Sequence, residues 1–367
     1  VKHPADWMIG KGADSTVVLT SRIRLARNLA KASFPGWANK KQRVEALEQM
    51  QPVVEGLSSM KDGFSKPLNS LNPLQKQVMV ERHLISREHA ARGEGSAAVI
   101  NREQSLAIMI NEEDHMRIQV IRSGLGLMDA YRAIDAVDDD LAEALDFAFD
   151  PELGFLTTCP TNLGTGLRGS AMLHLPGLVI SDQIGQVLQA VNKIGLAVRG
   201  IFGEGSESLG NLFQISNQST LGESEAEILK RLERVIGQVA VHESNARGKL
   251  LEEDPDMVYD KVGRAYGVLK HAWVMSSKEA LDHLSAMRLG ANLGFFPEST
   301  MLACDELLME IQPAHLQLEN GRKLSPDERD ALRAEIIRGK LQNLDPPTNY
   351  SKESNSSNAS SSDTKHS

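Results

Sequence analysis

The strongest constraint on the fold is a change of pattern near residue 250 of this 367-residue chain. Before that point, short β-branched and apolar segments alternate with helical ones, which is typical of a mixed α/β domain. Beyond Pro255 only helical spacing occurs, and from Asp345 the chain is rich in serine and asparagine. Such a tail buries too little apolar surface to order itself. We therefore expect a domain over residues 1–250, a helical domain over 251–344 and a disordered tail over 345–367.

Apolar periodicity places elements within the first domain. It predicts strands at 16–28, 97–101, 105–110, 196–202 and 211–216, and an apolar run at 118–121. Helices are expected at 39–56, 126–149 and 181–194, and another begins at Ser224, which has Glu227 as a capping-box partner.

Composition excludes several classes of protein. The net charge of −9 argues against a general nucleic-acid binder. Two cysteines, Cys159 and Cys304, cannot form a disulfide framework, so a reducing compartment fits better. The sequence shows neither a leader pattern nor an apolar run of about 18 residues. We expect a cytoplasmic protein that binds neither membranes nor nucleic acid directly.

Five arginines from separate segments are candidate anion ligands. Arg22 and Arg24 are two positions apart, so in an extended strand both side chains project to the same side. Paired guanidinium groups suit a polyphosphate, whose oxygens each can bind in bidentate fashion. A solvated basic strand explains this pair equally well by itself. Together with Arg117, Arg168 and Arg199, however, they would hold the phosphates of a nucleotide and stabilise phosphoryl transfer.

Two carboxylates and a thiol stand in similar turns. Glu113 lies in an acidic run after a buried strand, Glu204 lies in a glycine-rich turn, and Cys159 begins the stretch Cys-Pro-Thr-Asn-Leu-Gly-Thr-Gly-Leu-Arg. A solvated turn is the alternative for the acidic run. Paired carboxylates fit a guanidinium acceptor, which needs orientation and loss of a proton as its nitrogen attacks phosphorus. Cys159 is expected to be a thiolate that adds a third negative charge.

Three segments together resemble a known family. Walker A, HRD and DFG sequences are absent, which removes the two commonest kinase architectures. Ser21–Arg24, Asn111–His115 and Cys159–Arg168, in this order, resemble the phosphagen kinases, or ATP:guanido phosphotransferases. From about residue 7 to 340 the chain is most similar to the bacterial protein-arginine kinases. The resemblance implies an α+β fold, in which a catalytic domain with an antiparallel β-sheet flanked by helices precedes a helical C-terminal domain.

The resemblance also assigns roles by motif position. Glu113 and Glu204 would bind and activate the guanidinium, with Cys159 beside it, and Mg²⁺ would be held mainly by phosphates and water. ATP would be held by Thr20, Ser21, Arg22, Ile23, Arg24, Arg117, Arg168, Gly169, Ser170, Ala171, Met172, Arg199, Gly200, Ile201, Phe202, Gly203 and Glu204, with His83 near the nucleotide.

The implied reaction transfers the γ-phosphoryl group of ATP to arginine side chains of proteins. In the family this marks substrates, including the heat-shock repressor CtsR, for the ClpC–ClpP protease during stress. The resemblance further implies a homodimer and activation by the zinc protein McsA.

A second site is expected in the C-terminal helices. Arg329, Asp330, Arg333 and Ala334 look like the family's phosphoarginine-sensing motif RDxxRA. The two arginines are four residues apart on one helix face, so together they would grip a phosphate as an allosteric site. An ordinary exposed charged helix is the alternative.

Two other functions remain possible from the sequence. One is a kinase of a free small guanidino compound, similar to arginine kinase. Against it, the chain begins almost at the arginine strand, without the N-terminal helical domain that helps phosphagen kinases close over such a substrate, and it carries an additional helical region. The other is a binding module or inactive adaptor, for which paired carboxylates are unnecessary.

Overall fold

A computed structural model describes residues 8, 12–200 and 208–348 of the chain. Its centre is one eight-stranded sheet in which every neighbouring pair of strands is antiparallel. The strands, in spatial order, are β2 (Phe64–Pro67), β3 (Ala97–Ile100), β4 (Leu106–Ile110), β5 (Met116–Ser123), β1 (Val18–Arg27), β8 (Leu167–His174), β10 (Leu212–Asn217) and β9 (Leu196–Gly200). A separate hairpin joins β6 (Phe149–Asp150) to β7 (Gly154–Phe155).

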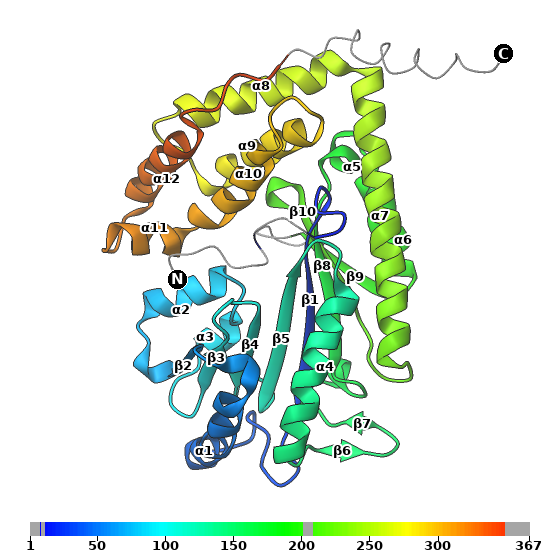
Figure 1. Cartoon of the computed structure of the whole chain (residues 1–367), viewed down its shortest axis with the longest axis vertical. Helices are drawn as coiled ribbons and strands as arrows, with labels where there is room; N and C mark the ends of the chain where they lie inside the picture. Colours follow the sequence, from blue (N-terminus) through cyan, green and yellow to red (C-terminus); the bar gives the residue numbers. More distant parts are fainter. Residues whose placement is uncertain (1–7, 9–11, 201–207, 349–367) are drawn as a thin grey trace, which may run out of the picture.

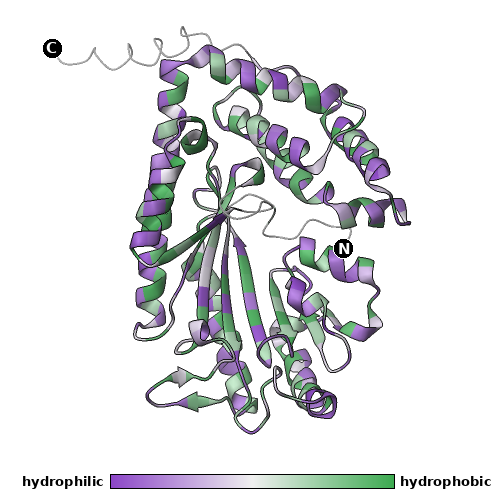
Figure 2. Cartoon of the chain, turned by 180° about the vertical axis from the view of Figure 1, so that it is seen from behind, coloured by the Kyte–Doolittle hydropathy of each residue, from purple (hydrophilic) through white to green (hydrophobic). Residues whose placement is uncertain are grey.

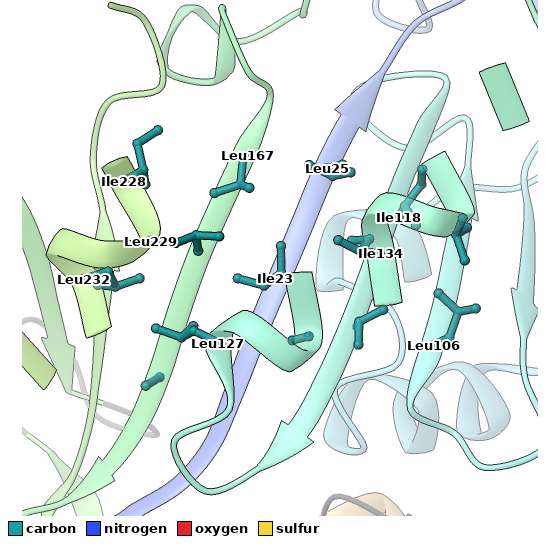
Figure 3. Packing of buried hydrophobic residues seen from close by; sticks show 14 of the residues in the cluster. Ile23, Leu25, Leu106, Ile118, Leu127, Ile134, Leu167, Ile228, Leu229 and Leu232 are labelled. Carbon is teal, nitrogen blue, oxygen red and sulfur yellow. The ribbon is translucent and has the colours of Figure 1, made fainter. Parts of the chain in front are cut away.

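One face of the sheet forms the main apolar core and packs under three helices. On β1, Ile23 and Leu25 are buried in the main core, and Leu25 pairs with Ile118 of β5 and Leu167 of β8. The covering helices are α1 (Lys40–Gly56), α4 (Leu127–Ala144) and α7 (Glu225–Glu253). Figure 3 shows the side chains of β1, β5 and β8 meeting those of α4 and α7. Because side chains alternate along a strand, the residues between them face the other side of the sheet.

The structure confirms most of the predicted helices and strands, and two of the helices are shorter than predicted. Ser224 and Glu227 form the predicted capping box of α7. The helix expected over 126–149 ends at Ala144, because Ala148 donates a backbone hydrogen bond to Asn28 beyond β1 instead. The helix expected over 181–194 begins only at Ile184, since Asp182 has a positive φ of 57°. Shorter helices complete this part: α2 (Pro73–Glu81), α3 (Arg87–Ala90), α5 (Pro176–Ile180) and α6 (Ile184–Lys193).

The C-terminal helices surround a core of their own at one end of the sheet (Figure 1). They are α8 (Pro255–His271), α9 (Ser277–Asn292), α10 (Ser299–Glu310), α11 (Pro313–Asn320) and α12 (Pro326–Leu341). Green and purple alternate along these helices in Figure 2, as expected for amphipathic helices around a shared core. None of the helices described is long and apolar enough to span a bilayer.

Two sets of hydrogen bonds tie these helices to the sheet region. The carboxylate of Glu81, at the end of α2, accepts the backbone N–H of Ala314 at 2.9 Å and pairs with Nδ1 of His315 at 2.9 Å. It therefore caps the N-terminus of α11. On the other side, Arg288 of α9 donates to the carbonyls of Ser15 and Thr16 just before β1.

A buried ion pair within α7 holds the first turn of α5, the helix that follows β8. Oε1 of Glu243 accepts from Nε of Arg247 at 2.6 Å, and the same carboxylate accepts the backbone N–H groups of Gly177 and Leu178. Burial raises the pKa of Glu243 although Arg247 opposes the shift. The pair therefore stabilises little relative to two apolar residues, but removing only one partner leaves a buried charge unpaired.

We predict that Glu243→Ala lowers the free energy of unfolding by about 3–5 kcal/mol. Glu253→Gln, which removes an exposed pair with Lys249 on the same helix, is the matched control and should change it by less than about 1 kcal/mol. Urea unfolding followed by circular dichroism measures both. Equal effects of the two variants would contradict a structural role for the buried pair.

Candidate active site

The face of the sheet opposite the main core carries the arginines. Arg24 lies directly across from Gln119 of β5 and Arg168 of β8, and Arg199 of β9 lies across from Gln214 of β10. Cross-strand partners project to the same face, so these side chains form a continuous polar surface. All five arginines predicted from the sequence line one cleft of 680 Å³: Arg22, Arg24, Arg117, Arg168 and Arg199.

Positive charge in this cleft exceeds what the described residues neutralise. Burial first, and then Arg117 and Arg168, lower the pKa of Arg22 to about 10. Burial, followed by the other arginines, also lowers the pKa of Arg24 well below its usual range. Arg22 donates only to the neutral Gln214, and Nε of Arg24 has no hydrogen-bond partner within the part of the chain that the structure describes. Partly buried guanidinium groups that lack a directly paired carboxylate are a site for a polyanion.

The three carboxylates of the acidic turn after β4 have two different roles. Glu112 is buried, pairs with Arg117 at 2.8 Å and accepts a hydrogen bond from Ser86. Asp114 is also buried and accepts from Asn28 and from the backbone of Thr158. These two hold the turn in place. Only Glu113, with a side chain 40% exposed, remains free to meet a ligand, and it lies 3.2 Å from Arg117.

Glu113 and Cys159 share a second, smaller pocket of 120 Å³. Its wall includes Gly166, whose φ is 67° and whose Cβ, if present, would lie 2.7 Å from the carbonyl oxygen of Ala26. Glycine is therefore required for the Cys159 loop to approach β1 this closely. Sγ of Cys159 lies 3.0 Å from Oγ1 of Thr161. Burial raises the pKa of Glu113, and Arg117 opposes the shift.

Three arginines line both hollows. Arg24, Arg117 and Arg168 belong to the wall of the large cleft and also to that of the small pocket. An anionic group held by these three would face the large cleft on one side and Glu113 with Cys159 on the other. This is the arrangement that transfer of a phosphoryl group between two bound molecules requires.

The residues that the motifs predict for the nucleotide site follow one another in the sequence, but strand alternation places their side chains on both faces of the sheet. Thr20, His83, Ser170 and Met172 line a hollow that adjoins the cleft at Arg22 and Gln214. Burial and then Arg22 lower the pKa of His83 to about 4, so its ring is neutral near pH 7. The opposite side of the sheet receives the side chains of Ser21, Ile23 and Ala171. A Cβ added at Gly169 would point to that side as well.

The β9 end of the predicted site is described only in part. Arg199 and Gly200 line the large cleft. Ile201, Phe202, Gly203 and Glu204 lie outside the described residues.

The C-terminal arginine motif does not present the expected phosphate grip. Arg333 is only 1% exposed and donates to the carbonyls of Ile311 and Met275 and to Asp330. Arg329 donates to the carbonyl of Leu324. Ala334 is fully buried in the C-terminal core. The four-residue spacing does not place two free guanidinium groups on one surface, because Arg333 turns inward and binds carbonyls that precede α9 and follow α10.

Sequence reasoning missed two glutamines in the cleft. Gln119 donates to the carbonyls of His83 and Leu84 and so positions the segment after α2. Gln214 accepts from Arg22. Each lies between two apolar neighbours on its strand, and each is in phase with an arginine on its own strand or the neighbouring one. A polar residue between apolar neighbours, in phase with an arginine, is the sequence feature that could have identified both glutamines.

Comparison with known proteins assigns the family. Residues 45–246 match the ATP:guanido phosphotransferase C-terminal catalytic domain, and residues 255–353 match the protein-arginine kinase McsB C-terminal domain. A protein-arginine kinase from Brevibacillus brevis is 45% identical over 340 residues, which is 92% of this chain and 95% of that protein. Another from Halothermothrix orenii is 44% identical over 93% of this chain and 97% of that protein. This chain belongs to the protein-arginine kinase family.

Solved phosphagen kinases share the fold of this protein-arginine kinase family member. The substrate-free duplicated taurocyamine kinase from Schistosoma mansoni matches with a TM-score of 0.57 and 25% identity, over 72% of this chain and 39% of that chain. Lombricine kinase matches with a TM-score of 0.55 and 26% identity, over 66% of this chain and 69% of that chain. The expected α+β phosphagen-kinase fold is confirmed, and the protein is a guanidino phosphotransferase.

For this guanidino phosphotransferase, we predict that Arg24→Met stabilises the nucleotide-free protein while removing nucleotide binding. Relief of repulsion in the cleft should raise the Tm by about 1–2 °C, the shift that about 1 kcal/mol gives in a protein of this size. The further rise produced by Mg-ATP should disappear, because an anion ligand is lost. Differential scanning calorimetry with and without Mg-ATP measures both effects.

Arg132→Met is the matched control, since Arg132 is exposed and pairs only with Asp129 on α4. It should leave both the Tm and the ATP-induced rise unchanged. A lower Tm for Arg24→Met, combined with a retained response to ATP, would contradict the charge argument.

Proposed function

We propose that this enzyme transfers the γ-phosphoryl group of ATP to arginine side chains of proteins. The observation that carries the proposal is the pair of hollows with Arg24, Arg117 and Arg168 between them. The large cleft has the volume and the arginines for a nucleotide, and the small pocket has a carboxylate for a guanidinium. The sequence relatives that cover nearly the whole chain are named protein-arginine kinases.

In this mechanism Arg22 and Arg199 bind the phosphates nearest the nucleoside, and the three shared arginines bind the group in transit. Mg²⁺ supplies charge neutralisation, held by phosphate oxygens and water. Glu113 orients the acceptor guanidinium so that one nitrogen lies in line with the bond to the leaving ADP oxygen. The N–P bond forms as the O–P bond to ADP breaks, and a carboxylate accepts the proton that the nitrogen loses.

Glu204 is proposed as the second carboxylate on the acceptor, by motif position. Cys159 lies beside Glu113 in the small pocket, where it would face the guanidinium.

The cellular role is proposed from the likeness to protein-arginine kinases. We propose a cytoplasmic homodimer that McsA activates and that marks proteins such as CtsR for ClpC–ClpP during stress. A kinase of a free small guanidino compound is the alternative, because taurocyamine and lombricine kinases share the fold. Their identity of 25–26% is well below the 44–45% of the protein-arginine kinases.

The acceptor class is tested by offering purified enzyme and Mg-ATP either casein or free arginine. Mass spectrometry under non-acidic conditions, which preserve the phosphoramidate, should find phosphoarginine in casein and none in the free amino acid. Phosphorylated free arginine without modified casein would assign the chain to the small-guanidine kinases. Glu113→Gln should slow casein phosphorylation by about 10²–10⁴-fold and leave ATP binding nearly unchanged, because the amide cannot accept the proton.

The raised pKa of Glu113 also predicts the pH dependence of the reaction. The ionised carboxylate is the active form, so turnover falls as pH decreases through the folded-state pKa of Glu113. Burial places that pKa above the ordinary value of 4.5. The rate of ADP release, followed with a coupled assay from pH 4 to 9, should therefore fall on the acidic side with a midpoint above pH 4.5. A rate that stays constant down to pH 4.5 would contradict the role of Glu113.

A further inference from the structure

An exposed tryptophan lies in a loop at one end of the sheet, outside the two hollows described above. The side chain of Trp37 is 79% exposed, the highest value among the large hydrophobic residues that the structure describes. It belongs to the loop between β1 and α1, and Figure 1 shows that this loop lies at the end of the sheet opposite the C-terminal helices. The site described above does not use it. A large apolar ring left in solvent is a candidate contact for another molecule.

The backbone around Trp37 is fixed in one conformation. The N–H groups of Trp37 and Ala38 both donate to the carbonyl of Phe34 at 2.9 Å. The ring of Phe34 stacks on that of Trp37 with centroids 6.4 Å apart, and Nη1 of Arg43 donates to the carbonyl of Ala38 at 2.6 Å. The indole therefore loses little conformational freedom when a ligand binds to it, which favours affinity.

The same turn packs against the segments that form the small pocket. The Phe34 ring meets the edge of His115, two residues after Glu113, at a centroid distance of 6.1 Å. A methyl group at Gly36 would lie 3.9 Å from Cγ2 of Thr158, the residue before Cys159. Thr158 itself donates to the carbonyl of Glu113 at 3.0 Å. The turn that carries Trp37 thus packs against both segments that supply Glu113 and Cys159 to the small pocket.

We infer that Trp37 is a docking surface for the polypeptide that carries the target arginine. The occupant is an extended segment of the substrate protein with an apolar side chain within a few residues of that arginine. The inference rests on the proposed function, because a free guanidino compound has no chain extending beyond the pocket. An extended chain advances about 3.3–3.6 Å per residue, so only flanking residues of a polypeptide acceptor reach the rim. Rigid exposed aromatic rings are the side chains that most often anchor such contacts.

The test uses two arginine peptides, one with leucines and one with glycines around the arginine. For Trp37→Ala we expect the KM of the leucine peptide to rise about tenfold, the loss of one modest anchor contact. The KM of the glycine peptide, the KM of ATP and kcat should stay unchanged, and Trp37→Phe should restore most of the loss. Trp273→Ala is the matched control: that tryptophan is 78% exposed but lies between α8 and α9, and its removal should change neither peptide's KM.

Binding of the unphosphorylated leucine peptide with Mg-ADP, measured by calorimetry, separates this inference from the proposed function. Binding that depends on Trp37, without any phosphorylation of either peptide, would support the docking surface and reject the kinase activity. Phosphorylation of both peptides with no effect of Trp37→Ala would reject the docking surface alone. A change in sedimentation coefficient for Trp37→Ala, with peptide kinetics intact, would assign the ring to contact between copies of the chain and also overturn the inference.

Discussion

Repulsion among buried arginines is the constraint on which the site depends. Arg22 and Arg24 on the central strand β1, with Arg117 and Arg168 on its two neighbours, place like charges together. Burial already lowers the pKa values of Arg22, Arg24 and Arg168. A loop could not hold them in this way, because it would move the charges apart. The opposite face of the same strands supplies the restraint, since Ile23 and Leu25 are locked under α4 and α7 (Figure 3). The polyanion that relieves the repulsion is then bound strongly.

Several parts of this account could be predicted from the sequence because they depend on local periodicity. The two-residue spacing of Arg22 and Arg24 fixes their shared face as soon as the strand is recognised. The same rule could have excluded Ile23 and Ala171 from the nucleotide site, yet motif positions grouped them with their neighbours. The separate roles of the three carboxylates in the acidic turn could not be predicted from the sequence. Only tertiary structure shows that Glu112 and Asp114 are buried and hydrogen-bonded, while Glu113 pairs with Arg117 and stays 40% exposed.

The C-terminal helices show the limit of spacing arguments most clearly. Four-residue spacing places Arg329 and Arg333 on one side of α12, but it does not say whether that side faces solvent or the core. In the structure Arg333 binds the carbonyls of Met275 and Ile311, so it fixes the ends of neighbouring helices. Next to Ile311, α11 begins and is capped by Glu81, whose helix precedes His83 in the cleft wall. These helices thus help to shape the nucleotide cleft.

The central claim is that Arg24, Arg117 and Arg168 hold the phosphoryl group between the two hollows. The most direct test is a crystal structure with Mg-ADP, an arginine-containing peptide and nitrate, a planar anion that stands in for the phosphoryl group in transit. The account predicts nitrate bound by these three arginines, with ADP in the large cleft and the peptide guanidinium beside Glu113. Nitrate bound elsewhere, or a guanidinium away from Glu113 while ADP occupies the cleft, would contradict it.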